Sequence, residues 1–299
     1  MVGAVGVQRC RTGVAELLQG LKKMRVGVRA TGRRTEPRLR GRTEAGRVAW
    51  GGWLSVLVLA AVAGGVFGVA TGRIPWPDAW NPWSPLQVEA PPNLLTRLKL
   101  QRLSGEPALC LATLDTAGFA FSPLPDGEAG PDCPLRNTVR LARTQVPLGG
   151  SLVMSCPAAV SLALWERHVV QPAALRHFGA ALSRIDQVGS LACRNVYGQA
   201  EGRRSRHATA DAIDITGFRF ADGRRVRVVS DWRAPAEVAT TGSAAANAQP
   251  AGTDAPAALF LAEVQRGACG FFDGVLGPGY NAAHRDHFHL DRGPYRVCR

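Results

Sequence analysis

The sequence predicts an α+β domain, a small antiparallel sheet with flanking helices, preceded by one transmembrane helix. Three observations predict this architecture. Residues 49–72 contain no charged residue and are almost continuously apolar. Farther along, short runs that alternate apolar and polar residues are typical of β-strands. Segments with proline in the first turn, at Pro157 and Pro172, are typical of helix starts.

The positive charge is concentrated before the apolar segment. Residues 1–48 carry twelve Lys and Arg against three acidic residues, whereas residues 106–299 carry twenty Arg against eighteen acidic residues. The net charge of +13 therefore belongs mainly to the tail, and we expect no nucleic-acid partner for the domain. A tail that binds nucleic acid or anionic lipid is a further interpretation, but it explains residues 1–48 only.

Residues 49–72 are long enough to cross a bilayer, since roughly 20 apolar residues suffice for a helix. Trp50 and Trp53 stand at one end and Trp76, Trp80 and Trp83 beyond the other, as in interfacial aromatic belts. The basic tail predicts a cytoplasmic N-terminus, with everything after the span outside. A signal peptide is the alternative, and a start at Met24 would favour it. The length of the leader favours an uncleaved anchor.

Six of the seven cysteines lie beyond the span, an even number that suits an oxidising compartment. We expect three disulfides among them, but six cysteines allow fifteen pairings and the sequence does not choose. Pairs Cys156–Cys193 or Cys193–Cys298 would each brace the segment next to Arg194. The six candidates are Cys110, Cys133, Cys156, Cys193, Cys269 and Cys298.

The segment after the span is rich in proline and tryptophan. Residues 73–104 predict a semi-rigid extended spacer that lifts the following domain off the membrane. The folded domain is expected to occupy residues 105–299, a size that allows one core. Within it, residues 234–258 are rich in Ala, Thr, Pro and Gly and predict a flexible insertion.

Helices and strands alternate along this domain. Ser155 and Pro157 predict one helix start, and a second helix is expected from Pro172 with Leu175, Phe178 and Leu182 on its buried face. A third is expected over 256–267. Strands are expected over 189–196, 211–220, 226–229 and 287–291, with Asp222-Gly223 as a hairpin turn.

Candidate metal ligands occur in two separate places. His207 and Asp214 are seven residues apart, and three of the six histidines fall within residues 284–289. Two histidines and a carboxylate form a typical catalytic zinc set, which leaves the fourth position open to water. Asp214 lies in an alternating apolar run that predicts a strand beside a buried face. The pattern predicts a zinc hydrolase.

Residues 205–214, with His284-x-x-His287-x-His289, resemble the signature of the zinc peptidases grouped as lysostaphin-type, D-Ala-D-Ala carboxypeptidase-type and hedgehog-type. Residues 192–194, 212–215, 275–279 and 286–291 more closely resemble the extensin-like C-terminal domain family of bacteria, over roughly 105–299. The resemblance implies a D-Ala-D-Ala carboxypeptidase/hedgehog-like fold. It also implies that His207, Asp214 and His289 bind Zn²⁺.

The same resemblance assigns catalytic residues. His287 matches the general base of the murein endopeptidase branch, and His284 matches a further histidine of that branch. Asp286 stands where the carboxypeptidase branch has a Glu base, and Arg194 matches an arginine that steadies substrate charge. One departure is Ala210, where the carboxypeptidase motif has Gly. Since His287 shares strand parity with His289, we expect His287 to be the base, with Asp286 or His284 holding it in place.

These features predict a zinc peptidase anchored in the bacterial inner membrane, with its domain in the periplasm. Its substrates would be amide bonds in peptidoglycan stem or cross-link peptides. The alternative is a non-catalytic, zinc-containing wall-binding or scaffold module. Such a module would tolerate loss of His287 and Asp286, whereas the enzyme would not.

Overall fold

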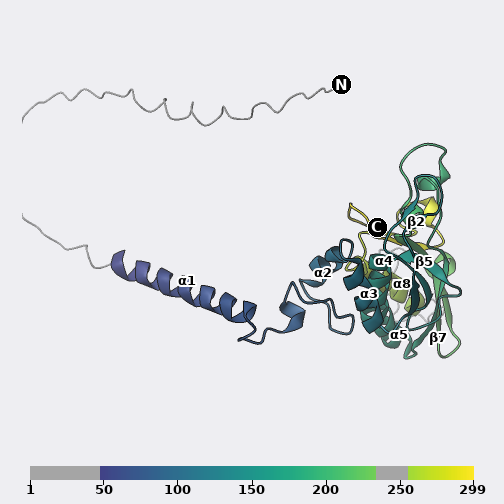
Figure 1. Ribbon diagram of the computed structural model, residues 1–299. Coiled ribbons are helices and arrows are strands. Elements are labelled where there is room, and N and C mark those ends of the chain that lie inside the picture. Colours follow the sequence, from purple (N-terminus) through teal and green to yellow (C-terminus); the bar gives the residue numbers. More distant parts are fainter. Residues whose placement is uncertain (1–47, 234–254) are drawn as a thin grey trace, which may run out of the picture. The chain divides into compact units, whose positions relative to one another are not determined.

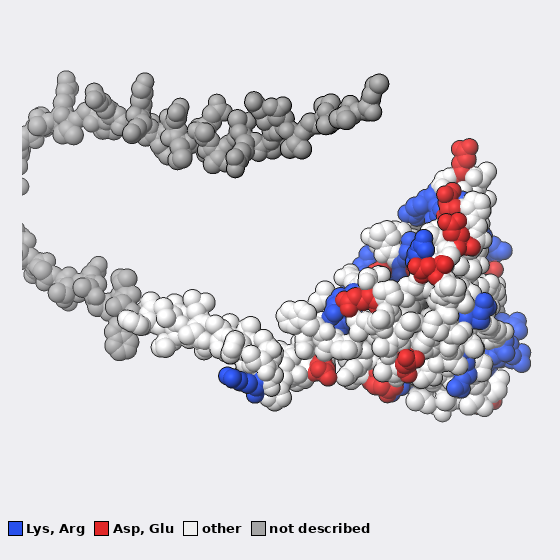
Figure 2. All heavy atoms as spheres, in the orientation of Figure 1, with Lys and Arg blue, Asp and Glu red and all other residues white. Residues whose placement is uncertain are grey.

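A computed structural model describes residues 48–233 and 255–299 (Figure 1). The chain is a mixed α/β protein with several sheets and helices. Charged side chains of both signs are spread over the folded domain (Figure 2). The predictions for the basic tail, residues 1–47, and for residues 234–254 of the insertion lie outside the described residues.

The first helix, α1 (Val48–Ala70), coincides with the predicted span. Its segment Gly52–Ala70 is long and apolar enough to cross a membrane, a property that signal sequences share. Contacts along the chain separate residues 1–66 from residues 67–299, and the second unit contains the folded domain.

The main sheet has the strand order β11-β9-β10-β7-β6, and β8 also pairs with β7. Every pair is antiparallel except β9 with β11. The long strand β7 alternates buried and less buried positions from Ile213 to Gly217, around Asp214, as its sequence predicts. The strands are β6 (Leu182–Gly189), β7 (Ala212–Phe220), β8 (Arg225–Arg227), β9 (Gly274–Leu276), β10 (Phe288–Asp291) and β11 (Val297–Cys298).

Two smaller sheets complete the β-structure. The first has the order β1-β4-β5 and is antiparallel, and the second is the pair β2-β3. Their strands are β1 (Ala120–Pro123), β2 (Gly127–Glu128), β3 (Pro134–Leu135), β4 (Thr138–Arg143) and β5 (Leu152–Ser155).

Helices pack beside the strands, with α3, α4 and α5 gathered on one side of the domain (Figure 1). Ser155 caps α4 by accepting a hydrogen bond from the Ala158 amide, as its sequence predicts. Trp165 at the end of α4 donates its indole N–H to the Val264 carbonyl and lies 6.0 Å from the Phe218 ring. The helices are α3 (Pro107–Thr116), α4 (Cys156–Trp165), the π-helix η2 (Glu166–Val170), α5 (Gln171–Phe178), α6 (Val228–Asp231) and α8 (Ala255–Ala268).

Three predicted element boundaries are wrong. Gly179 adopts a left-handed conformation (φ 64°) and ends α5, so Leu182 begins β6 instead of lying on the helix. The strand expected over 189–196 is instead β6, which ends at Gly189. Residues 228–231 form α6 and do not extend the hairpin strand.

The prediction of an extended spacer over residues 73–104 is also wrong for much of that segment. Helix α2 (Thr96–Arg102) and the turn η1 (Asp78–Trp80) lie within residues 73–104. Leu86, Val88 and Leu100 are buried in the main hydrophobic core. Burying these apolar side chains stabilises the fold, so the folded unit begins well before residue 105.

The six cysteines form three disulfides, as predicted: Cys110–Cys156, Cys133–Cys193 and Cys269–Cys298. Neither pair that the sequence suggested beside Arg194 occurs, since Cys193 is bonded to Cys133. The bridges tie α3 to α4, the β2-β3 region to the loop after β6, and the end of α8 to β11.

Candidate metal centre

Two neighbouring strands bring Asp214 and His289 together. Asp214 lies on β7 and His289 lies directly opposite it on β10. His207 comes from the short helix η4 (Arg206–Thr209), which precedes β7. Ser205 caps that helix by accepting from the His207 amide at 3.3 Å. Residues far apart in the sequence thus meet at the centre of the sheet.

The turn between His207 and β7 contains Ala210, the position where the carboxypeptidase motif has Gly. Ala210 has φ 56° and ψ 23°, a left-handed conformation in which glycine carries no steric penalty. Its carbonyl accepts from the Ser155 amide at 2.8 Å, which fixes the turn to the start of α4. Alanine keeps the turn at the cost of backbone strain.

Three side-chain atoms converge. His207 Nε2 lies 3.2 Å from Asp214 Oδ1 and 3.1 Å from His289 Nδ1, and His289 Nδ1 lies 3.0 Å from Asp214 Oδ1. The side chains are largely buried, with exposures of 6%, 13% and 11% for His207, Asp214 and His289. The structure therefore brings together the three residues that the sequence selected as metal ligands.

The outer nitrogen of each imidazole is held by an acceptor. His207 Nδ1 lies 3.2 Å from the Ser190 carbonyl, and His289 Nε2 lies 3.0 Å from Asp291 Oδ2. When the rings are neutral, as in metal-bound histidines, these outer nitrogens carry the protons, and Nε2 of His207 and Nδ1 of His289 present lone pairs. The facing atoms are then all acceptors, together with the Asp214 carboxylate. A cation between them satisfies all three.

The electrostatics of the cluster also favour positive charge. Burial alone would raise the pKa of Asp214, but hydrogen bonds and charge from His207 and His289 hold its pKa far below the usual range. Burial lowers the pKa of His289, yet its hydrogen bonds to Asp214 and Asp291 outweigh burial and raise the pKa to about 9. Two carboxylates thus stabilise positive charge at this point.

His287 lies beside the cluster. Its Nε2 is 3.7 Å from Asp214 Oδ1, and its Nδ1 is 2.9 Å from Asp286 Oδ1. Because the carboxylate accepts, Nδ1 carries the proton and Nε2 presents a lone pair toward the cluster. The hydrogen bond from His287 lowers the pKa of Asp286. Asp286 therefore faces the back of His287, the arrangement expected of a carboxylate that orients a histidine.

His284 forms the next part of the rim. Its Nδ1 donates to Asn281 Oδ1 at 2.7 Å, and its ring centroid lies 5.3 Å from that of His287. Burial, together with the neighbouring imidazoles of His289 and His287, lowers the pKa of His284 to about 4. Tyr280 and Tyr197 contact its ring edge-on, at 5.5 and 6.4 Å.

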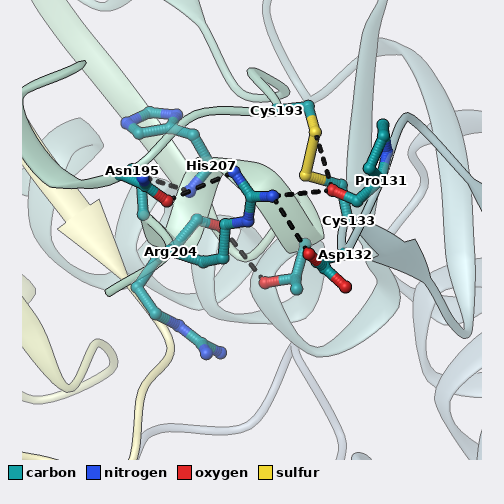
Figure 3. The surroundings of a disulfide bond; sticks show 10 residues. Pro131, Asp132, Cys133, Cys193, Asn195, Arg204 and His207 are labelled. Carbon is teal, nitrogen blue, oxygen red and sulfur yellow. Dashed lines mark hydrogen bonds and ion pairs between the residues drawn. A yellow bond between two sulfur atoms is a disulfide. The ribbon is translucent and has the colours of Figure 1, made fainter. Parts of the chain in front are cut away.

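The loop that leads to His207 is braced by covalent and polar contacts (Figure 3). Cys193 is bonded to Cys133, and Arg204 donates to the Pro131 carbonyl at 2.9 Å and to Asn195 Oδ1 at 3.2 Å. Asn195 and Arg204 also form a backbone bridge. This bracing fixes the approach to His207.

Arg194 lies on the braced loop. Its carbonyl accepts from the Ser205 amide at 3.0 Å, two residues before His207. Its side chain is exposed, and within the described parts of the chain the guanidinium makes no hydrogen bond or ion pair. The structure therefore does not join Arg194 to the cluster of His207, Asp214 and His289.

The family of the chain is shown by its sequence. The family described as extensin-like protein C-terminus matches residues 108–299, well over half of the chain. The chain belongs to this family. No curated protein and no solved structure matches the chain. The metal-type cluster lies entirely within the extensin-like region.

The sequence alone did not single out three residues around the cluster of the extensin-like domain. Asp291 is fully buried and lies two residues after His289, so strand parity places both on one face of β10. The same parity that selected His287 was a usable signal for Asp291. Ser190 acts through a tertiary contact, for which the sequence holds no local signal. Asn281 lies three residues before His284 and caps the short helix Ala282–His284, so an asparagine at a helix start was a usable local signal.

Proposed function

We propose that this protein is a membrane-anchored, zinc-dependent peptidase that hydrolyses amide bonds in peptidoglycan peptides. The observation that carries the proposal is the convergence of His207 Nε2, Asp214 Oδ1 and His289 Nδ1, with a histidine–carboxylate pair beside them. The proposed fold relation is to the D-Ala-D-Ala carboxypeptidase and hedgehog group, and the motif spacing supports it.

The donor set fits zinc. Two ligand atoms of a tetrahedral site with bonds of about 2.0–2.1 Å lie about 3.3 Å apart, and the three atoms here are 3.0–3.2 Å apart. Two imidazoles and one carboxylate leave a fourth position for water or substrate. When bound, zinc supplies a Lewis acid that activates water and polarises a carbonyl.

The protein's own residues would move the proton. His287 Nε2 faces the cluster and would accept a proton from the attacking water, then return it to the leaving amine. One proton is thus taken and given back in each turnover. Asp286 would hold the neutral ring in the tautomer with the proton on Nδ1, which leaves the Nε2 lone pair facing the water. His284, bonded to Asn281, would limit the movement of His287 from the other side.

Arg194 completes the proposed catalytic set as the positive charge that meets the substrate. Its exposed side chain has no protein partner within the described residues, which leaves it available to a carboxylate of the peptide. We assign it to substrate binding and not to the metal, because only its backbone connects it to the ligand segment.

Three features support the proposed location. The basic residues 1–48 precede α1, an order that favours a cytoplasmic N-terminus by the positive-inside rule. All three disulfides lie after α1, as expected of a domain in the periplasm. Peptidoglycan peptides are the amide substrates of that compartment, and we propose the inner membrane as the anchor.

The test uses the full chain in detergent with isolated peptidoglycan, analysed by mass spectrometry of the released peptides. Zinc-loaded protein is expected to release peptides, a chelator to abolish release, and added zinc to restore it. His287→Ala serves as the matched control that keeps the ligands.

A different outcome would identify the alternative function. Zinc-loaded protein that sediments with peptidoglycan and releases nothing would be a wall-binding module. Release that persists in chelator would contradict a role for zinc.

A further inference from the structure

The residues that follow α1 expose an unusual amount of apolar surface. Between residues 74 and 98, six large hydrophobic side chains are exposed, and Trp83 and Leu94 reach 79% and 88%. From residue 99 onward, the described parts of the chain expose only six others, and these are scattered. We call the first set the tryptophan platform: Ile74, Trp76, Trp80, Trp83, Leu94 and Leu98.

Charge shows the same contrast. Charged side chains are frequent over the folded domain and sparse along the segment that follows α1 (Figure 2). Residues 74–98 contain Asp78, Glu89 and Arg97 as their only charged residues. Two of these are engaged by the domain, since Glu89 pairs with Arg167 and Arg97 pairs with Asp273.

Hydrogen bonds from two side chains of α2 hold the segment that carries the tryptophans. Lys99 donates from Nζ to the Asp78 carbonyl at 2.6 Å and to Ser84 Oγ at 3.0 Å. Arg102 donates to the Pro82 carbonyl at 2.7 Å. Burial lowers the pKa of Lys99, so its ammonium group depends on these partners. The segment that carries the three tryptophans is therefore folded and is not an extended spacer.

Buried side chains and hydrogen bonds hold the same segment in place against the folded domain. Leu86 and Val88 are buried in the main core, and the Val88 carbonyl bonds to His168 Nε2 at 2.8 Å. Asn93 donates to the Ala79 carbonyl at 2.7 Å. A fixed surface that leaves several large apolar side chains exposed marks a contact with a partner or a membrane.

The chain is short between the end of α1 and the platform. Ile74 donates its amide to the Gly68 carbonyl at 3.0 Å, so the chain turns at the last turn of the helix. Its side chain occupies the space where a Cβ on Gly68 would lie. Trp76 and Trp80 follow Ala70 by six and ten residues, at most about 22 and 36 Å of extended chain. Tryptophan is enriched at the level of lipid headgroups.

We propose that the tryptophan platform seats in the headgroup region of the bilayer that α1 crosses, and holds the domain against the membrane. The partner is the lipid surface itself. This inference rests on the membrane anchor of the proposed function but not on zinc or hydrolysis. It replaces the expectation that residues 73–104 lift the domain away from the membrane.

The test places the full chain in vesicles of phosphatidylcholine and phosphatidylglycerol, with or without bromine near the headgroup end of the acyl chains. Bromine quenches tryptophan by contact. The fluorescence of wild type minus that of W76F/W80F/W83F isolates the three platform tryptophans. We expect brominated lipid to quench most of this difference. The matched control is Trp232→Phe, because Trp232 packs on Phe288 with ring centroids 5.5 Å apart. Its difference signal should stay unquenched.

Each outcome is decisive once alkaline extraction shows whether the chain is integrated. An integrated chain whose platform signal is unquenched overturns the proposal and points to a second copy or another protein as the cover. A chain that alkali extracts overturns both the anchor and the platform. Neither result depends on the peptidoglycan assay, so failure of the peptidase proposal remains separate.

Discussion

The two pairs of histidines in the extensin-like domain differ in what holds their outer nitrogens. His207 and His289 are held by the Ser190 carbonyl and by Asp291, whose side chain is fully buried. His287 is held by Asp286, whose side chain is 48% exposed. The first pair is fixed from behind by groups that water barely reaches. The second pair is His287 with His284, which is held by the partly exposed Asn281, so both of its partners are more accessible to water.

This difference suits two tasks. A metal ligand works best when its ring orientation and tautomer never change, and buried acceptors supply that constancy. A base must gain and lose a proton in each cycle, so it benefits from a partner that stabilises the charged ring without burying it. We therefore interpret His207 and His289 as ligands and His287 as the group that transfers protons.

The largest effect is expected from His287→Ala, which should separate zinc binding from catalysis. The variant should fold and keep its zinc, because the ligands and their acceptors are untouched. Peptide release should fall by roughly 10²–10⁴-fold, the usual scale for loss of a general base. Parallel measurements of zinc content and of release rate check both parts. Loss of zinc together with activity would show that His287 is itself a metal ligand, like His207 and His289.

The next effect is expected from Asp291→Asn, which keeps the shape of the side chain and removes its charge. Zinc affinity should fall by about 10–100-fold, because the carboxylate behind His289 raises the basicity of the ring. Competition with a zinc-binding dye measures the affinity. Unchanged affinity would show that the buried acceptor does not tune the ligand.

A smaller loss is expected from Asp286→Ala. Its hydrogen bond fixes the tautomer of His287 and is worth about 1.5 kcal/mol, or about tenfold in rate. Steady-state rates of Asp286→Ala and His287→Ala on the same peptide give the ranking. A larger loss in Asp286→Ala, with zinc retained in both, would make the carboxylate the base.

The smallest effect concerns the turn between two of the ligands. Ala210→Gly should raise the stability by about 1 kcal/mol or less, since glycine adopts the left-handed conformation without strain. Zinc affinity should not change. Thermal unfolding measures the first quantity. Destabilisation would mean that the buried methyl group of Ala210 contributes more than the strain costs.

Much of the site was predictable because strands carry their own periodicity. The alternation around Asp214 predicted a strand, and the structure has β7 there, paired with the β10 segment that carries His289. The count of disulfides followed from the cysteines beyond the span. Short-range patterns of this kind can be recognised from neighbouring residues in the sequence, without knowledge of the fold.

What could not be predicted depends on contacts distant in sequence. The spacer over residues 73–104 looked extended because of its prolines, yet Leu86 and Val88 are buried in a core built by later elements. Tertiary packing outweighed local composition there. The disulfide partner of Cys193 and the acceptor behind His207 also depend on segments that the fold brings together. The end of α5, by contrast, carried a local signal, since Gly179 follows Arg176 and His177, and glycine after basic residues is typical of a helix end. The 3–4 spacing of Leu182 gave the wrong boundary because it ignores that signal.

The most direct test of the account is the zinc content of the purified chain, wild type against His207→Ala, by elemental mass spectrometry after dialysis against zinc-free buffer. We expect one zinc per wild-type chain and none in His207→Ala, with both proteins still holding their three disulfides. Equal zinc content in the two proteins would contradict the assignment of His207, Asp214 and His289 as the metal site.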